Sequence, residues 1–177
     1  MSTPGPKVFL VGMMGAGKTT VGQRLAARLG GRHLDSDAEV RRRTGRTIPE
    51  IWRSDGEAAF RVEESRALAD AVADPEAAVV DVAGGAVLDP ANRELLRGAG
   101  AVVWLRAEPA TLAARVGDGR GRPLLEGDPA GAVARLDAVR RPVYAELADV
   151  VVDVDELSPD QVVERILAAL PPPAPGR

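Results

Sequence analysis

The sequence predicts one α/β domain over residues 1–170, in which helices cover both faces of a parallel sheet. Short apolar runs of strand length alternate with amphipathic segments of helix length along the chain, which is typical of this fold class. The length supports the same conclusion, because 177 residues suffice for one proper core and are too few for two ordinary domains.

The first part of the chain predicts a strand, a helix and a second strand. Residues 8–11 are all apolar and end at a glycine. A helix is expected over 18–29, because its apolar residues recur on one face and Gly30 follows its last turn. Residues 33–35 then form a brief second strand.

Helices follow the second strand. A helical stretch starts near Asp37 and ends around Gly45. Thr47 and Glu50 match a capping box, so they predict the start of another helix. A long helix is expected over about 56–73.

The second half repeats the alternation of strand and helix. The predicted strands are residues 78–82, 101–105 and 150–152. The predicted helices begin at Pro90, Pro109, Pro129 and Pro159, the last capped by Ser158, and proline is favoured at the first helical position.

Two segments predict irregular structure. Residues 117–123 contain three glycines and one proline, which break helices, so we expect a mobile loop over about 117–126. The tail, residues 171–177, is rich in proline, and we expect it to be disordered.

Composition narrows the function classes. A net charge of −3 and a pI of about 5.3 give no basic surface for nucleic acid or anionic membranes. The absence of cysteine excludes disulfides and thiolate chemistry. No apolar run is long enough to span a bilayer and no signal segment is visible, so we expect a cytoplasmic protein, and a monomer.

Residues 12–19 match the phosphate-binding pattern G-x-x-x-x-G-K-[ST], between a predicted strand and a predicted helix. Glycines let backbone N–H groups turn toward phosphate oxygens, and the helix start adds the positive end of its dipole. We therefore expect Lys18 to reach the β- and γ-phosphates of ATP, and the Thr19 hydroxyl to bind Mg²⁺. The predicted ATP-binding residues here are Gly15, Ala16, Gly17, Lys18, Thr19 and Thr20.

Other proteins with this phosphate loop fit the sequence less well than a small-molecule kinase. GTPases select guanine with an N-K-x-D element, whereas the only asparagine, Asn92, is followed by Arg93. A motor ATPase normally needs a longer chain. A kinase must keep water from ATP, so it needs a closing lid with positive charge. The loop at 117–126, with Arg120 and Arg122, fits that need.

Acidic and basic residues could hold the phosphoryl acceptor. Asp35 and Asp37 follow the second strand, at the sheet edge where parallel sheets bind ligands. A carboxylate there can hold a Mg²⁺-bound water or accept a hydroxyl proton, whereas the alternative for Asp37 is to cap a helix. Arg61 and Arg140 lie within predicted helices, where a solvated surface position is the alternative for each.

Together these motifs resemble those of shikimate kinases, from residue 8 to about residue 170. Beyond the phosphate loop, the resemblance rests on Asp35-Ser36-Asp37, the segments 44–48 and 54–57, Phe60-Arg61 with Glu64, Gly84-Gly85-Ala86, Arg122-Pro123-Leu124-Leu125 and Arg140-x-Pro142-x-Tyr144. It implies a P-loop fold like that of nucleoside monophosphate kinases, a five-stranded parallel sheet in the order 2-3-1-4-5, and a mobile lid. It also implies ATP-dependent phosphorylation of the shikimate 3-hydroxyl, which yields shikimate 3-phosphate and ADP. A gluconate kinase or a non-catalytic ATP-gated module is the alternative.

The resemblance further implies a role for particular residues. Lys18, Asp37 and Arg122 would be catalytic, with Asp37 as the base. The shikimate site would comprise Asp37, Arg61, Gly84, Gly85 and Arg140. Asp35 would hold Mg²⁺ through water beside Thr19, and the remaining ATP contacts would come from Arg115, Arg122, Ser158 and Pro159.

The chain departs from the family pattern at three places. Ala83 stands where the family usually has glycine, which costs about 1 kcal/mol if the position needs a positive φ. Asp81 stands where a small hydroxyl residue is common, and we hypothesise that it adds a second carboxylate near Mg²⁺. Glu156 and Leu157 replace basic residues and are expected to alter ATP affinity rather than chemistry.

Overall fold

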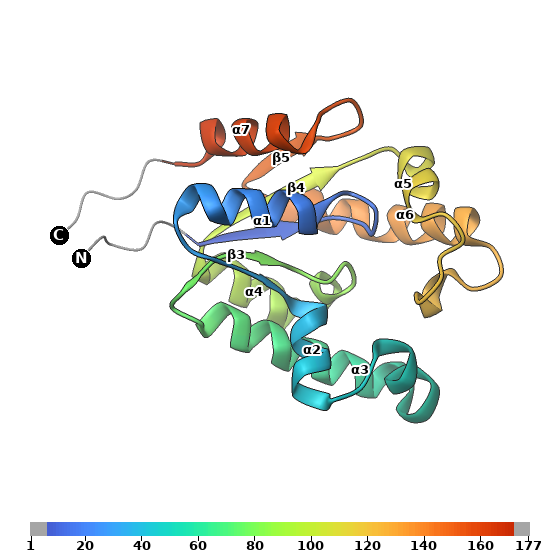
Figure 1. Cartoon of the computed structure of the whole chain (residues 1–177). Coiled ribbons are helices and arrows are strands. Elements are labelled where there is room, and N and C mark those ends of the chain that lie inside the picture. The colour runs from blue at the N-terminus through green and yellow to red at the C-terminus, as the bar shows by residue number, and fades with distance from the viewer. Residues whose placement is uncertain (1–6, 172–177) are drawn as a thin grey trace.

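The computed structural model describes residues 7–171, which form three layers, with a five-stranded sheet between two layers of helices (Figure 1). The strands lie in the order β2-β3-β1-β4-β5 and all neighbours are parallel, which confirms the predicted fold class and strand order. The strands are β1 Val8–Val11, β2 Arg32–Asp35, β3 Ala77–Asp81, β4 Ala101–Arg106 and β5 Val150–Asp153.

Helices α1 and α7 cover one face of the sheet, and α3, α4 and α6 cover the other (Figure 1). The α-helices are α1 Lys18–Leu29, α2 Ser36–Thr44, α3 Ile48–Ala73, α4 Pro90–Ala99, α5 Pro109–Val116, α6 Pro129–Leu147 and α7 Pro159–Ala169. Two short 3₁₀-helices are η1 Ala86–Leu88 and η2 Pro123–Leu125.

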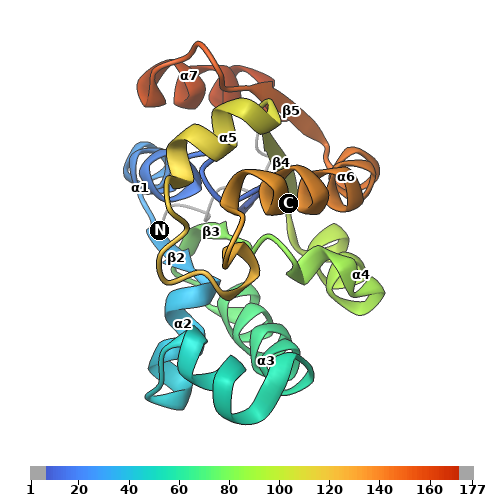
Figure 2. The same cartoon turned by 90° about the vertical axis from the view of Figure 1, so that its right-hand side faces the viewer.

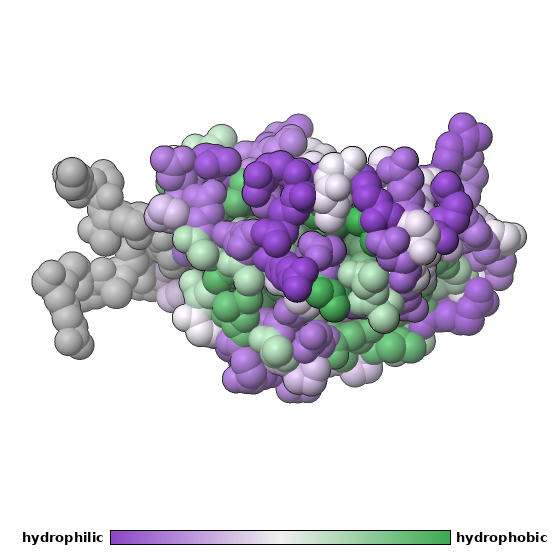
Figure 3. Space-filling model, turned by 90° about the horizontal axis from the view of Figure 1, so that it is seen from below, coloured by the Kyte–Doolittle hydropathy of each residue, from purple (hydrophilic) through white to green (hydrophobic). Residues whose placement is uncertain are grey.

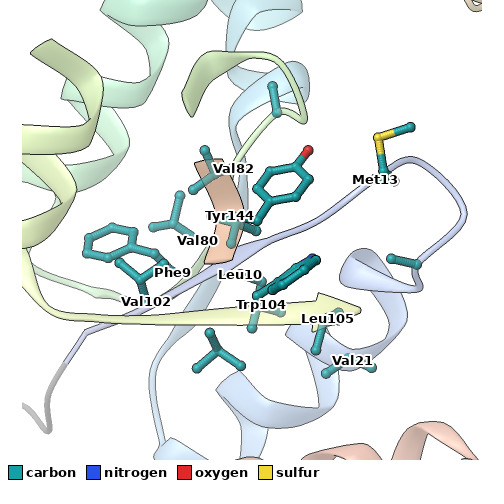
Figure 4. Close-up of a cluster of buried hydrophobic side chains, with 14 of the residues drawn as sticks. Phe9, Leu10, Met13, Val21, Val80, Val82, Val102, Trp104, Leu105 and Tyr144 are labelled. Atoms are coloured by element: carbon teal, nitrogen blue, oxygen red, sulfur yellow. The ribbon is translucent and has the colours of Figure 1, made fainter. Parts of the chain in front are cut away.

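The core surrounds the central strand β1, whose four residues are all buried. Phe9 and Leu10 of β1 lie among side chains from both neighbouring strands, including Val80 and Val102, and close to Trp104 (Figure 4). The continuous apolar pattern of β1 is explained by burial on both faces of the sheet.

The carboxyl ends of the strands meet at one edge of the sheet because all strands are parallel. Asp35, the last residue of β2, lies beside Asp81, the last residue of β3. Leu10 of β1 pairs with Asp81 on one side and with Val103 on the other. The loops after β1, β2 and β3 therefore open at the same edge.

Helix α2 and the first part of α3 extend from the sheet edge at β2 (Figure 1). Helices α2 and α3 contain a second, smaller apolar cluster, formed by Val40, Ile51, Phe60 and Ala67. Gly56 has φ 85° and ψ 174° and divides α3 into two helical parts. This break agrees with the two helices predicted on either side of this position.

The remaining differences from prediction are local. Element ends shift by a residue or two, and the loop at 117–126 contains η2, whose Leu125 is fully buried. Of the predicted tail, residues 172–177 lie outside the described residues. No helix within residues 7–171 is long and apolar enough to cross a membrane.

Exposed large apolar side chains are scattered over the described surface. Val62 lies on α3, Leu88 at the end of η1 and Val139 on α6. The view from below shows hydrophilic residues interspersed with hydrophobic ones (Figure 3).

Candidate active site

The phosphate loop joins β1 to α1 and is shaped by glycines. Gly15 and Gly17 have φ values of 84° and 94°, a left-handed conformation that glycine adopts without strain. Gly17 caps α1 without a side-chain hydrogen bond, so the first N–H groups of this helix lack a capping side chain. Such a helix start is suited to bind an anion.

The Lys18 side chain folds back over this loop. Its Nζ donates hydrogen bonds to the carbonyl oxygens of Gly12 at 2.7 Å and Met13 at 3.2 Å. Burial lowers the pKa of Lys18, and the nearby carboxylates, first Asp81 and then Asp37, oppose that shift. The loop therefore presents a partly buried ammonium group to the cleft.

The predicted nucleotide and acceptor residues share one cavity, with a volume of about 560 Å³. Predicted site residues that line it are Gly15, Gly17, Lys18, Thr19, Thr20, Asp35, Asp37, Arg61, Gly84, Gly85, Arg122 and Arg140. The loop between α5 and α6, which carries Arg122, reaches toward α2 and α3 (Figure 2). The phosphate loop and the side chains of Arg61 and Arg140 thus line a single cleft.

Four predicted ATP-binding residues do not line this cavity. Ala16 is buried and its N–H bonds to the Met13 carbonyl oxygen. Arg115 donates to the carbonyl oxygens of Gly15 and Val154, so it links the phosphate loop to the loop after β5. Ser158 caps α7, and Pro159 is the first residue of that helix.

Arg61 is held in the cleft by acidic neighbours on its own helix. Its Nη1 donates to both carboxylate oxygens of Glu64, at 2.9 and 2.8 Å, and its Nη2 donates to Glu57 at 3.3 Å. Burial raises the pKa of Glu64, whereas the Arg61 charge acts to lower it. The Glu64 side chain is only 3% exposed, so it fixes the guanidinium from the protein side.

Arg140 is a buried cation on α6. The residue is 2% exposed, and within residues 7–171 no carboxylate forms an ion pair with it. In the described part of the chain its Nε has no hydrogen-bond partner, and its Nη1 approaches the Met13 sulfur at 3.8 Å. A buried unpaired charge is costly, so this side chain is suited to meet an anionic ligand. The surface alternative for Arg140 is wrong.

The turn after β3 brings backbone close to both guanidinium groups. A Cβ on Gly84 would lie 2.8 Å from Arg140 Nη1, and a Cβ on Gly85 would lie 2.6 Å from Arg61 Nη1. Buried Tyr144 secures the turn by donating its hydroxyl hydrogen to the Gly84 carbonyl oxygen at 2.7 Å. A side chain at either position would therefore displace the neighbouring guanidinium group.

Asp35, rather than Asp37, caps α2. Asp35 Oδ1 accepts hydrogen bonds from the backbone N–H groups of Asp37 and Ala38. Asp37 lies in the first turn and lines the cleft. Burial raises the pKa of Asp37, the Asp35 charge adds to this, and Lys18 opposes it. The buried Ser36 hydroxyl accepts the Ala83 N–H at 2.9 Å, which ties this turn to the loop after β3.

Two of the departures from the family pattern have a structural outcome. Ala83 does not adopt a positive φ, so this position carries no left-handed strain. Asp81 is buried, and its Oδ2 lies 2.9 Å from His33 Nε2. Burial lowers the pKa of His33, but the Asp81 carboxylate outweighs burial and the net shift is upward.

Sequence reasoning assigned no role to several residues of the cleft. Ile48, Trp52 and Phe60 form an apolar wall, and the Trp52 and Phe60 rings lie 5.7 Å apart. The i, i+4 spacing of Ile48 and Trp52 could have predicted a shared face. Arg41 also lines the cavity, one turn after Asp37.

The fold and the cleft together define a P-loop kinase of small molecules, in which the phosphate loop and the guanidinium groups of Arg61 and Arg140 line one cavity. The family model for shikimate kinase matches residues 14–171 of this chain. The chain belongs to the shikimate kinase family.

Individual relatives agree with this assignment. A shikimate kinase from Burkholderia lata is 44% identical over 168 residues, which cover 94% of this chain and 91% of the relative. A solved shikimate kinase from Acinetobacter baumannii, in complex with shikimate, is 38% identical with a TM-score of 0.88, covering 92% of this chain and 90% of that chain. A gluconokinase from Sinorhizobium meliloti is 22% identical with a TM-score of 0.58, covering 96% and 93% of the two chains, and shows similarity of fold alone.

Proposed function

We propose that this enzyme transfers the γ-phosphoryl group of ATP to the 3-hydroxyl of shikimate, in one in-line step without a covalent enzyme intermediate. ATP-dependent phosphorylation of shikimate is the reaction of the family to which the chain belongs. The proposal concerns the hydroxyl that reacts and the residues that carry the reaction.

The unpaired Arg140 is the observation that carries the acceptor assignment. It lies in the same cavity as Lys18 and close to the Gly84–Gly85 turn, where Arg61 also approaches. Two guanidinium groups at a glycine turn suit a carboxylate, which can accept paired hydrogen bonds from each planar fork. An acceptor bound there by its carboxylate would direct its hydroxyl groups toward the phosphate loop.

Asp37 is proposed to bind the reacting hydroxyl and to accept its proton. Burial and the Asp35 charge raise the pKa of Asp37, which makes its carboxylate a better proton acceptor. Lys18 and Arg41 stabilise the charged form, so the group still functions as a base. The proton would move from the acceptor oxygen to a carboxylate oxygen as the new phosphorus–oxygen bond forms.

The residues present fit a Mg²⁺ ion that is bound together with ATP. Within residues 7–171 no group of three or more acidic or histidine side chains could hold a metal ion by itself. Mg²⁺ usually takes one or two protein oxygens and completes its shell with phosphates and water. Thr19 would supply a hydroxyl, Asp35 would bind through water, and Asp81 would add a second carboxylate. When bound, the ion would neutralise charge on the phosphates.

Catalysis would then depend on positioning and on cancellation of charge. Lys18 would release its bonds to the loop carbonyls and contact the β- and γ-phosphates. Arg122 would approach the transferring group as the loop at 117–126 closes and excludes water. Leu125, near the end of that loop, is buried and would anchor it during closure.

The adenine end of ATP would lie beyond the cavity, near Arg115 and the loop before α7. Arg115 spans Gly15 and Val154, so it connects the phosphate loop with that region. Ser158 and Pro159 would edge the base. A cytoplasmic location and a monomeric state are also part of this proposal.

A coupled assay of ADP release tests the function. The enzyme is supplied with MgATP and, separately, with shikimate, gluconate, a nucleoside monophosphate or no acceptor. Of these acceptors, we expect only shikimate to raise ADP release above the acceptor-free rate. The ³¹P and ¹H spectra of the product should place the phosphoryl group on the 3-oxygen of shikimate. Faster release with gluconate, or equal rates with and without acceptor, would overturn the proposal.

A further inference from the structure

His33 and Asp81 form a contact beside the cleft, which Asp81 lines and His33 does not. His33 and Asp35 share one face of β2, because they are two residues apart, and Asp35 lies beside Asp81 in the parallel register. His33 Nε2 comes within 2.9 Å of Asp81 Oδ2. The imidazole thus meets the carboxylate from the neighbouring strand.

Helix α1 is adapted to this contact. A Cβ on Gly22 would lie 2.6 Å from both Asp81 Oδ1 and His33 Nε2. The absence of a side chain at Gly22 therefore leaves the space that the two groups occupy. The pair lies under the helix that begins with Lys18 and Thr19.

The Asp81 carboxylate is buried but not satisfied. Its side chain is 4% exposed, and neither oxygen has a hydrogen-bond partner of good geometry in the described part of the chain. Asp81 also lines the main cavity, and among nearby carboxylates it acts most strongly on Lys18. A buried carboxylate in this condition favours a cationic or hydrated ligand from the cavity side.

We propose that His33 is a positioning residue, which fixes the Asp81 carboxylate so that Asp81 can hold the hydrated divalent cation of the nucleotide complex. This inference rests on the proposed function, in which Asp81 contributes to the Mg²⁺ site. His33 contacts Asp81 without lining the cavity, whereas Asp81 itself lines it. Groups that orient a metal-binding side chain in this way typically change metal affinity about ten- to hundredfold when removed.

The test compares variants of both partners with a control on the same strand. His33→Leu removes the imidazole, His33→Gln retains a terminal N–H donor, and Asp81→Ser removes the carboxylate. Arg32→Leu is the control. Arg32 is the residue of β2 next to His33, and its replacement removes only surface ion pairs with Asp74 and Glu76. Two quantities are measured: the Mg²⁺ concentration for half-maximal activity, and the calorimetric affinity for ADP with and without Mg²⁺.

We expect His33→Leu and Asp81→Ser each to raise the half-maximal Mg²⁺ concentration about tenfold and to weaken the Mg²⁺-dependent gain in ADP affinity. The double variant His33→Leu/Asp81→Ser should show no larger change in Mg²⁺ dependence than either single variant, because His33 acts through Asp81. The half-maximal Mg²⁺ concentrations of His33→Gln and Arg32→Leu should each lie within about twofold of the value for the parent protein.

The outcomes separate this inference from the proposed function. Unchanged Mg²⁺ dependence in folded His33→Leu would overturn the role of His33, even if Asp81→Ser shows the defect. Unchanged Mg²⁺ dependence in both would also remove Asp81 from the metal site, while shikimate phosphorylation by the parent protein would stand. If thermal melts show that His33→Leu does not fold, His33→Met replaces it and the same criteria apply.

Discussion

At the scale of single residues, the two acceptor-side arginines of the cleft have different charged neighbours. Arg61 is neutralised in part by Glu64 and Glu57, whereas Arg140 is buried and has no acidic partner among residues 7–171. A bound carboxylate would therefore gain most from Arg140, while Arg61, already oriented, adds a pre-positioned hydrogen-bond donor. The two roles are distinguishable by substitution.

Arg61→Ala is predicted to raise the KM for shikimate about ten- to hundredfold with a smaller change in kcat, since a charged hydrogen bond contributes about 1.5–3 kcal/mol. Steady-state kinetics with varied shikimate at saturating MgATP measure this. Arg61→Lys keeps a charge beside Glu64 and should show a smaller KM effect. Arg66→Ala is the matched control, because exposed Arg66 pairs with Glu63 on the same helix. An unchanged KM in Arg61→Ala would remove Arg61 from the acceptor site.

At the scale of elements, α1 combines two tasks. Its start forms the anion site, and its inner face packs against the ends of β2 and β3. Glycine within a helix normally weakens it, by about 1 kcal/mol relative to alanine. At Gly22 the close approach to Asp81 reverses that expectation.

Gly22→Ala is predicted to destabilise the fold by about 1–3 kcal/mol, because the new methyl group would overlap the His33–Asp81 pair at 2.6 Å. The free energy of unfolding in urea measures the effect. Gly98→Ala in α4 is the control, since a Cβ there meets nothing within 4 Å and should leave stability unchanged or raise it. A Gly22→Ala protein as stable as the parent would show that the helix has room to shift.

At the scale of the whole molecule, the structural features that depend on local residue patterns could be predicted from the sequence. Strand and helix positions follow from apolar periodicity and caps, and the phosphate loop follows from one short motif. The strand order came from the family resemblance, because periodicity does not specify which strands are neighbours. It is confirmed by the sheet.

Capping geometry, burial and contacts between elements could not be predicted from local pattern. Asp35 and Asp37 are both residue types that cap helices, and the backbone geometry decides which of them caps α2. The burial of Glu64 against Arg61 and the approach of His33 to Asp81 depend on packing between elements. Nothing in the sequence around Arg140 signals that this cation is buried without a partner.

The central claim is that the phosphate loop and the acceptor site act across one cleft, with Asp37 between them. Replacement of Asp37 by the isosteric Asn, with kcat and the affinities for ADP and shikimate measured on the same preparation, tests it most directly. We predict that kcat falls about a thousandfold, in the range for loss of a general base, while both ligands still bind. An Asp37→Asn enzyme that keeps more than about a tenth of the parent kcat would contradict the account.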